Sequence, residues 1–114
     1  MKKLIASNTT PPRPALADGY SWGNDITPKE IAVGDFVRQL PSGRADGCGG
    51  GHSGYCGTVY KAARVNVCVT TKYQIGHSGD PNNPPIDLDL GAHRRTEINF
   101  VTRGKTVHMV KEAA

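Results

Sequence analysis

The fold is decided by residues 31–73, where two short apolar runs and one long alternating run are separated by glycine-rich sequence. The first run is VGDFVR at 33–38 and the second is GTVY at 57–60. The third, VNVCVTTKY at 65–73, places valine, threonine and tyrosine at the odd positions and mostly polar residues between them. Strict alternation over nine residues is typical of a half-buried strand. We therefore predict three antiparallel strands, with the odd-numbered side chains of the third facing the core.

The composition sets the size and class of the molecule. With 114 residues, 14 glycines and 8 prolines, the chain is expected to form one domain rich in turns and long loops. No apolar run approaches the roughly 20 residues that span a bilayer. The start, MKKLIA, lacks the apolar segment of roughly 7–15 residues found in a signal peptide. We therefore expect a cytoplasmic protein, or a component of a virion-like particle assembled there, with no membrane partner.

The first 26 residues are predicted to be an extended, proline-rich arm that precedes a domain at 27–112. The sequence TTPPRP at 9–14 cannot sustain a helix and favours extended backbone. Tyr20 and Trp22 are the only large aromatic residues of this arm. Either they fold back over an edge of the domain, or they anchor a partner, because tryptophan and tyrosine dominate interface hot spots.

Further elements follow from local sequence. TPKE at 27–30 has the form of a capping box with proline at the first helical position, which predicts a single helical turn. Strands are expected at 36–40 and 55–62, on either side of a glycine-rich loop, with a tight turn near 63–64. A second long loop at 75–94 contains the acidic patch IDLDL at 86–90, whose alternation also suits a short edge strand.

Two strands are predicted to close the chain. In the first, Thr96, Ile98, Phe100 and Thr102 are expected to share one face. A turn at 103–104 then leads to the second, at 106–110, with Val107 and Met109 facing inward.

The glycine positions support a family resemblance. GDFV at 34–37 and GTV at 57–59, followed by the valine-rich strand, resemble the KOW and SH3-like barrels of translation proteins, which open their first two strands with Gly-Asp-x-Val and Gly-x-Val. The resemblance implies a mainly β fold, a small five-stranded antiparallel SH3-like barrel, with Gly34 at a bend and Gly57 at a kink or bulge. Such barrels bind RNA, DNA, peptides or neighbouring subunits, so the resemblance implies a binding module without naming its partner.

The sequence GHSG occurs twice, at 51–54 and 76–79, in loops expected at the same end of the barrel. Three hypotheses remain open: simple flexible loops, an anion cradle reinforced by Arg44, Arg94 and Arg95, or a zinc site. An odd cysteine count favours reduced thiols or a metal over a disulfide framework. The candidate zinc ligands are Cys48, His52, Cys56 and His77, with His93 as an alternative fourth; no other cofactor is suggested.

Catalytic motifs are missing from the sequence. It contains neither a phosphate-binding Gly-x-x-x-x-Gly-Lys-Ser/Thr pattern nor a Gly-x-Ser-x-Gly nucleophile motif. Asp80, Asp87 and Asp89 have no acid, base or metal motif beside them, so a solvated loop explains them better. We expect a protein that is not an enzyme and has no small-molecule substrate.

The net charge of +4 and the pI near 9.1 permit a polyanionic partner. Our leading hypothesis is a small-barrel module that contacts nucleic acid or a nucleoprotein assembly, as would suit a phage or mobile-element accessory protein. The candidate contacts are Arg38, Arg44, Lys61, Arg64, Lys72, Arg94, Arg95, Arg103 and Lys105. The alternative is a protein-binding structural or adaptor subunit, for example a virion component or an inhibitor of a host complex. It would bind through Tyr20, Trp22, Ile86 and Leu88, by adding a strand to a partner's sheet.

Overall fold

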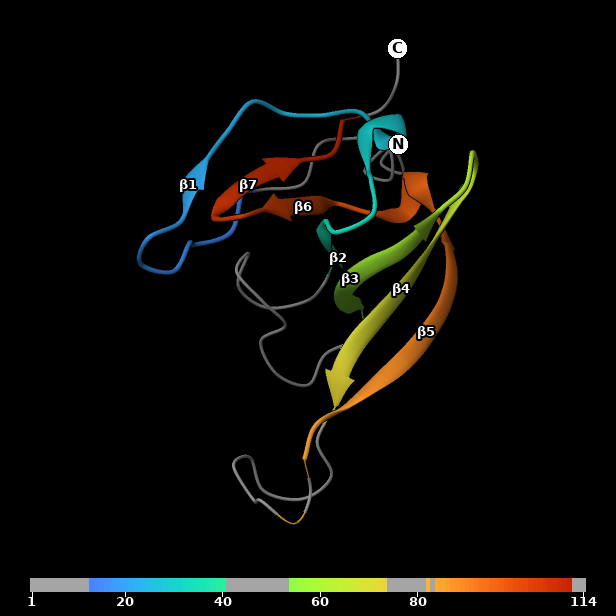
Figure 1. The fold of residues 1–114 in the computed structure, drawn as a ribbon. Helices are drawn as coiled ribbons and strands as arrows, with labels where there is room; N and C mark the ends of the chain where they lie inside the picture. Colours follow the sequence, from blue (N-terminus) through green and yellow to red (C-terminus); the bar gives the residue numbers. More distant parts are fainter. Residues whose placement is uncertain (1–12, 41–53, 74–81, 83, 112–114) are drawn as a thin grey trace, which may run out of the picture.

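The computed structural model describes residues 13–40, 54–73, 82 and 84–111. Within these ranges the chain forms one sheet in the order β1-β7-β6-β2-β3-β4-β5 (Figure 1). Neighbouring strands are antiparallel except for β1, which runs parallel to β7. The strands are β1 (Ser21–Trp22), β2 (Phe36–Gln39), β3 (Tyr55–Ala62), β4 (Asn66–Tyr73), β5 (Ile86–Arg94), β6 (Phe100–Arg103) and β7 (Thr106–Met109). Two short 3-10 turns, η2 (Pro28–Glu30) and η3 (Arg95–Glu97), lie between strands.

The predicted closed five-stranded barrel is wrong, although the mainly β class is confirmed. The sheet is open: its terminal strands, β1 and β5, do not pair with each other, and the described residues contain seven strands. The two additional strands come from the predicted arm and the predicted loop. A two-residue strand carries no periodicity, and β5 continues beyond the IDLDL patch as far as Arg94.

The last part of the predicted arm belongs to the sheet. Ser21 and Trp22 pair with β7, and Ile26 is only 6% exposed and forms a parallel bridge with Val110. Tyr20 and Trp22 pack against a buried cluster on β6 and β7. The aromatic residues therefore fold back onto the domain, and a role for them as partner anchors stays a prediction.

The long hairpin β3–β4 follows its predicted course. β3 spans the predicted 55–62, and β4 begins one residue later than expected. Val67 and Val69 are fully buried, as predicted, whereas Val65 lies before the strand and is 49% exposed. The alternation therefore predicts the buried face correctly once the strand has begun, because successive side chains of a strand point to opposite faces.

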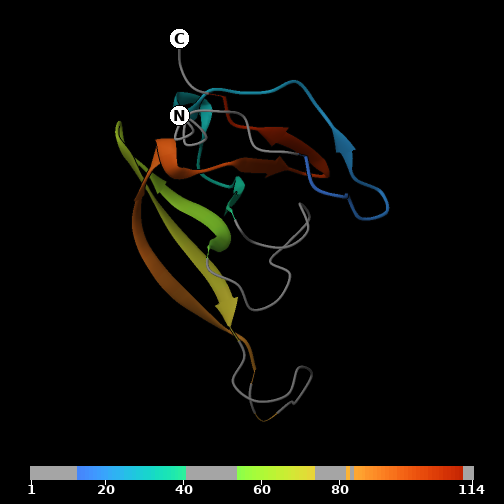
Figure 2. The same cartoon turned by 180° about the vertical axis from the view of Figure 1, so that it is seen from behind.

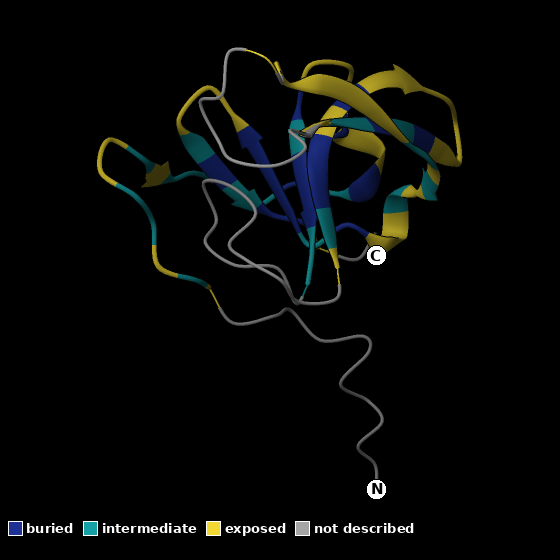
Figure 3. Ribbon diagram, turned by 90° about the horizontal axis from the view of Figure 1, so that it is seen from below, coloured by how far each residue is buried: buried dark blue, intermediate teal, exposed yellow. Residues whose placement is uncertain are grey.

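Two apolar clusters cover the two faces of the sheet. Adjacent residues of a strand point to opposite faces of the sheet. Phe100 and Val101 of β6 are adjacent and belong to different clusters, so the two clusters lie on opposite faces. Figure 3 shows that the buried residues concentrate in the middle of the sheet. The first cluster contains Ile26, Ile31, Val37, Val59, Val67, Val69, Ile98, Val101 and Val110. The second contains Phe100, Val107 and Met109, and Leu16, Tyr20, Trp22 and Leu40 pack against it.

We predicted that Thr96, Ile98, Phe100 and Thr102 share one face, and this is wrong for Thr96 and Ile98. Residues 95–97 form η3, so the two-residue alternation cannot begin until β6. Ile98 joins the first cluster and Phe100 the second. The inward positions predicted for Val107 and Met109 are confirmed.

The predicted capping box is confirmed at η2. Oε2 of Glu30 accepts hydrogen bonds from the backbone N–H and the hydroxyl of Thr27, both at 3.0 Å. Pro28 occupies the first turn, where its missing N–H is not needed. The turn ends after three residues, and the chain then reaches Gly34 and Asp35.

Asp35 joins the segment before β2 to β6 through one buried carboxylate. It is 4% exposed and accepts hydrogen bonds from the Ala32 N–H at 2.8 Å and from Nε and Nη2 of Arg103 at 2.8 and 3.1 Å. Arg103 also donates to the Glu30 carbonyl. Before it, Gly34 adopts a φ of +97° and donates to the Val59 carbonyl. Gly34 thus links the start of β2 to β3, and Asp35 links it to β6 through Arg103, which also reaches η2.

Gly57 is needed because two backbones approach closely. A Cβ at this position would lie 2.4 Å from the carbonyl oxygen of Thr70 and 2.7 Å from Cγ1 of Val69. The β-bulge of this hairpin lies between Val59 and Lys61, so the predicted bulge is displaced from Gly57.

We predict that Gly57→Ala destabilises the fold by about 1–3 kcal/mol, because the added methyl group overlaps backbone that cannot move freely. Chemical denaturation measures the change in the free energy of unfolding. The neighbouring Thr58→Ala, at an exposed position, serves as the control and should change stability by less than about 0.5 kcal/mol. Equal effects of the two substitutions would contradict the close approach of β3 and β4.

We also predict that Asp35→Asn destabilises the fold by about 2 kcal/mol, since it leaves the Arg103 guanidinium without its charged partner. The matched control is Asp87→Asn, which removes the Lys72–Asp87 ion pair, whose side chains are 74% and 65% exposed. That control should change stability by less than about 0.5 kcal/mol. Thermal and urea denaturation of the two variants would refute the prediction if Asp87→Asn were the more damaging.

Candidate functional site

β5 is the longer of the two terminal strands of the sheet, and its outer edge is a candidate binding surface. β4 pairs with β5 from Ile86 to Arg94, and no strand among the described residues pairs with its other side. Figures 1 and 2 show β4 and β5 running away from β6 and β7 as a long ribbon. The hydroxyl of Thr70 donates to the Leu88 carbonyl at 3.0 Å, so this carbonyl faces β4. Because backbone groups alternate sides along a strand, the amide and carbonyl of Asp87 face the outer edge.

One face of β5 carries an apolar stripe, which we define as Ile86, Leu88 and Leu90. Leu90 is half-buried against the first apolar cluster, whereas Ile86 and Leu88 are 51% and 41% exposed. The apolar stripe therefore begins at the core, at Leu90, and runs along β5 to Ile86, where its side chains are exposed to solvent. Exposed branched residues on an edge strand are a feature of sheets that accept another strand.

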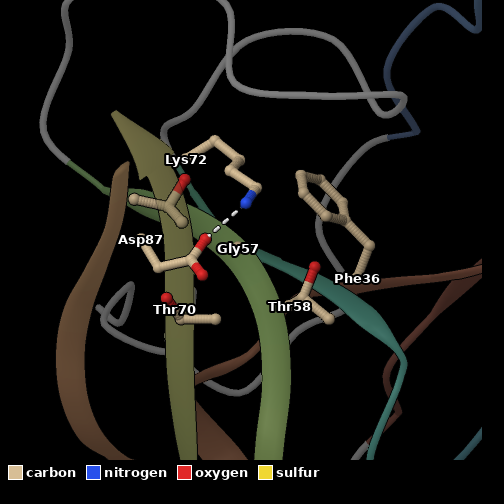
Figure 4. Close-up of a pocket in the computed structure, with 7 residues that line it drawn as sticks. Phe36, Gly57, Thr58, Thr70, Lys72 and Asp87 are labelled. Atoms are coloured by element: carbon tan, nitrogen blue, oxygen red, sulfur yellow. Dashed lines mark ion pairs between the residues drawn. The ribbon is translucent and has the colours of Figure 1, made fainter. Parts of the chain in front are cut away.

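The other face of β5 carries two aspartates. Asp87 forms an ion pair with Lys72 at 2.7 Å (Figure 4). Oδ1 of Asp89 accepts hydrogen bonds from the Tyr60 hydroxyl at 2.7 Å and the Gly91 N–H at 2.9 Å. The Tyr60 bond, followed by that of Gly91, lowers the pKa of Asp89, and the same hydroxyl contact raises the pKa of Tyr60 to about 12. Asp87 is thus paired with an ammonium group on this surface, whereas Asp89 is held by the Tyr60 hydroxyl and the Gly91 N–H.

A shallow hollow of about 290 Å³ lies on the aspartate face, between β2 and β5. Figure 4 shows threonine hydroxyls and the Phe36 ring around it, with the Lys72–Asp87 pair at one side. Its described lining supplies threonine hydroxyls, one ammonium group and one carboxylate for hydrogen bonding. The lining residues are Phe36, Gly57, Thr58, Thr70, Thr71, Lys72 and Asp87.

Three of the predicted basic contacts are used within the fold. Arg38 is 1% exposed and lies over the Phe100 ring at 5.3 Å, so it does not belong to a basic surface. Arg95 donates to the carbonyls of Ala63 and Ile31 at 2.8 and 2.6 Å. Arg103 is held by Asp35, as described above. Sequence patterns could not predict these contacts, because the partners are far apart in the sequence; Arg103 and Asp35, for example, are 68 positions apart.

The other predicted cations fall into separate groups. Lys61, Arg64 and Arg94 are exposed around the β3–β4 turn, where Asn66 pairs with Arg94; we call these three the turn cluster. Lys105 lies at the β6–β7 turn, and Arg44 lies outside the described residues. Among the described residues, the candidate nucleic-acid contacts gather only in the turn cluster, while Lys72 and Lys105 lie exposed elsewhere.

The predicted zinc ligands are not brought together in the described part of the chain. Cys48, His52 and His77 lie outside it, and Cys56 is buried and disulfide-bonded, so it offers no thiolate. The expectation of reduced thiols is wrong for Cys56 and holds for Cys68, because an odd count is compatible with one disulfide and one free thiol. Among the described residues, no three histidine, cysteine or acidic side chains are grouped to hold a metal.

A contact that the sequence did not predict joins the start of β3 to the end of β5. The rings of Tyr55 and His93 stack at 4.1 Å, and Nδ1 of His93 lies 3.6 Å from the Glu97 carboxylate. Burial, together with the charge of Glu97, raises the pKa of Tyr55. His93 also contacts the Leu90 carbonyl at 3.0 Å. The contact fixes the end of β5 and leaves the Ile86 end projecting.

Comparison with protein-family models, with curated proteins and with solved structures finds no match for this chain. The structure describes no helix with the length and apolar character needed to cross a membrane.

We predict that Tyr60→Phe raises the pKa of Asp89 toward that of an ordinary aspartate, because the hydroxyl that stabilises its charged form is lost. Carboxyl-detected NMR titration from pH 2 to 6 measures the change. Glu30, whose pKa is lowered by the Thr27 amide and hydroxyl, is the internal control and should not move. A pKa of Asp89 that stays low in the variant would remove Tyr60 from this role.

Proposed function

We propose that this protein is a non-enzymatic protein-binding module that receives a strand of another protein along the outer edge of β5. The observation that carries the proposal is the exposure of Ile86 and Leu88 on a terminal strand. A partner strand there would bond to the outward backbone groups and cover the apolar stripe. This is the behaviour expected of an adaptor or structural subunit within a larger assembly.

The contacts that the candidate cations make within the fold support this function over a nucleic-acid module. A nucleic-acid surface needs several accessible cations on one face. Arg38, Arg95 and Arg103 are instead used inside the fold, and Lys72 pairs with Asp87. The two aspartates beside the edge would repel phosphate groups.

Nucleic-acid binding is kept as a second candidate because of the turn cluster. Lys61, Arg64 and Arg94 are exposed, and they lie at the end of β4 and β5 opposite to Ile86. Three cations suffice for weak, salt-sensitive contact with a phosphate backbone. Substitutions at the two ends of the ribbon therefore separate the two functions.

Affinity capture from cells that naturally produce the protein tests the proposal. We expect a partner protein that is retained by the wild type and by Lys61→Glu/Arg64→Glu, is insensitive to nuclease, and is lost from Ile86→Lys/Leu88→Lys. Both double variants change exposed positions, so circular dichroism should show an unchanged fold.

The opposite pattern identifies the second candidate. Loss of the captured material with nuclease, or with Lys61→Glu/Arg64→Glu alone, would assign the function to the turn cluster. Capture that is indifferent to Ile86→Lys/Leu88→Lys, or no captured protein at all, would overturn the proposal for β5.

A further inference from the structure

We infer that the strand received by β5 alternates apolar and basic residues, and that it comes from a different protein rather than from a second copy of this chain. The inference rests on the proposed function and adds the chemistry of the partner. It follows from the different character of the two faces of β5 near its projecting end.

Side chains directly opposite each other in a strand pair share a face of the sheet. A strand docked on the outer edge of β5 would therefore place every second side chain beside the apolar stripe and the others beside Asp87 and Asp89. Apolar side chains would cover Ile86 and Leu88, which are 51% and 41% exposed. The remaining positions would meet the aspartates.

The aspartate face favours cations on the partner. It contains two carboxylates, and Lys72 supplies a cation only on the β4 side of Asp87. Asp89 has no cation within ion-pair distance among the described residues; its contacts there are the Tyr60 hydroxyl and the Gly91 N–H. Lysine or arginine on a partner strand would provide the missing charge, and opposite charges across a strand pair are stabilising.

The same charges disfavour pairing between two copies of the chain. Antiparallel pairing centred on Leu88 would set Asp87 of one copy opposite Asp89 of the other. Pairing centred on either aspartate would set that residue opposite its own counterpart. A shift by one residue would place aspartate opposite leucine or isoleucine and join the apolar face of one copy to the polar face of the other. The first two arrangements are unfavourable because like charges directly opposite each other destabilise a sheet. The shifted arrangement is unfavourable because it joins faces of different character.

Synthetic peptides provide the test with the full chain. The probe is a blocked nine-residue peptide alternating valine and lysine, and the matched control replaces every lysine by glutamate. Fluorescence anisotropy should give roughly tenfold tighter binding of the lysine peptide, with the preference shrinking at high salt. Backbone NMR shifts should be confined to residues 86–90 and the strand beside them.

Two variants separate the contribution of the backbone hydrogen bond to peptide binding from that of the charge. Asp87→Pro removes an outward N–H from the edge and should abolish binding of the lysine peptide, whereas Asp87→Asn, which also loses the charge, should retain binding with a reduced preference. Asp87→Asn/Asp89→Asn should bind both peptides with similar affinity. Analytical ultracentrifugation should show that the wild type does not associate through β5.

The outcomes distinguish this inference from the proposed function. Equal binding of both peptides, still sensitive to Asp87→Pro, would overturn the basic partner and leave strand addition standing. Binding of neither peptide, or self-association abolished by Leu88→Lys, would also overturn the inference. The capture experiment judges strand addition separately, because it does not depend on the partner's charge.

Discussion

The buried carboxylate of Asp35 is the constraint on which the rest of the structure depends. A charge that is 4% exposed must be matched by good hydrogen bonds, and the guanidinium of Arg103 supplies two of them in the bidentate geometry that suits a carboxylate. Because Arg103 ends β6 and Asp35 precedes β2, their pairing sets the register of the central strands. The Val59 amide bonds to the Asp35 carbonyl, which extends the same constraint to β3.

With the middle of the sheet fixed in this way, its two ends differ. At one end, β1 is short, and Trp22 on it and Tyr20 just before it are packed against β6 and β7. At the other end, β5 is anchored where His93 stacks on Tyr55 and projects where Ile86 is exposed. The described part of the chain therefore has a packed body and one long unpaired edge, which suits the proposed addition of a partner strand.

Patterns in the sequence predicted those parts of the fold that depend on interactions between residues close together in the chain. The capping box at Thr27, the bounds of β3, and the burial of Val67 and Val69 all depend on residues close in sequence. The open sheet, β1 and the burial of Arg38 depend on pairings between distant segments, for which one sequence contains no periodic signal. The candidate edge was half predicted: Ile86 and Leu88 were singled out, whereas the hydrogen bond between Tyr60 and Asp89 joins positions that only the sheet brings together.

The parallel pairing of β1 with β7 has a consequence for how the chain folds. Ser21 and its partner Thr106 are far apart in the sequence, so their pairing closes a long loop, and the entropic cost of that closure favours its formation late in folding. Trp22 is the only tryptophan, and it becomes packed against Phe100 in that same step. Its fluorescence during refolding should therefore report the final event of assembly, separately from the formation of the central hairpins.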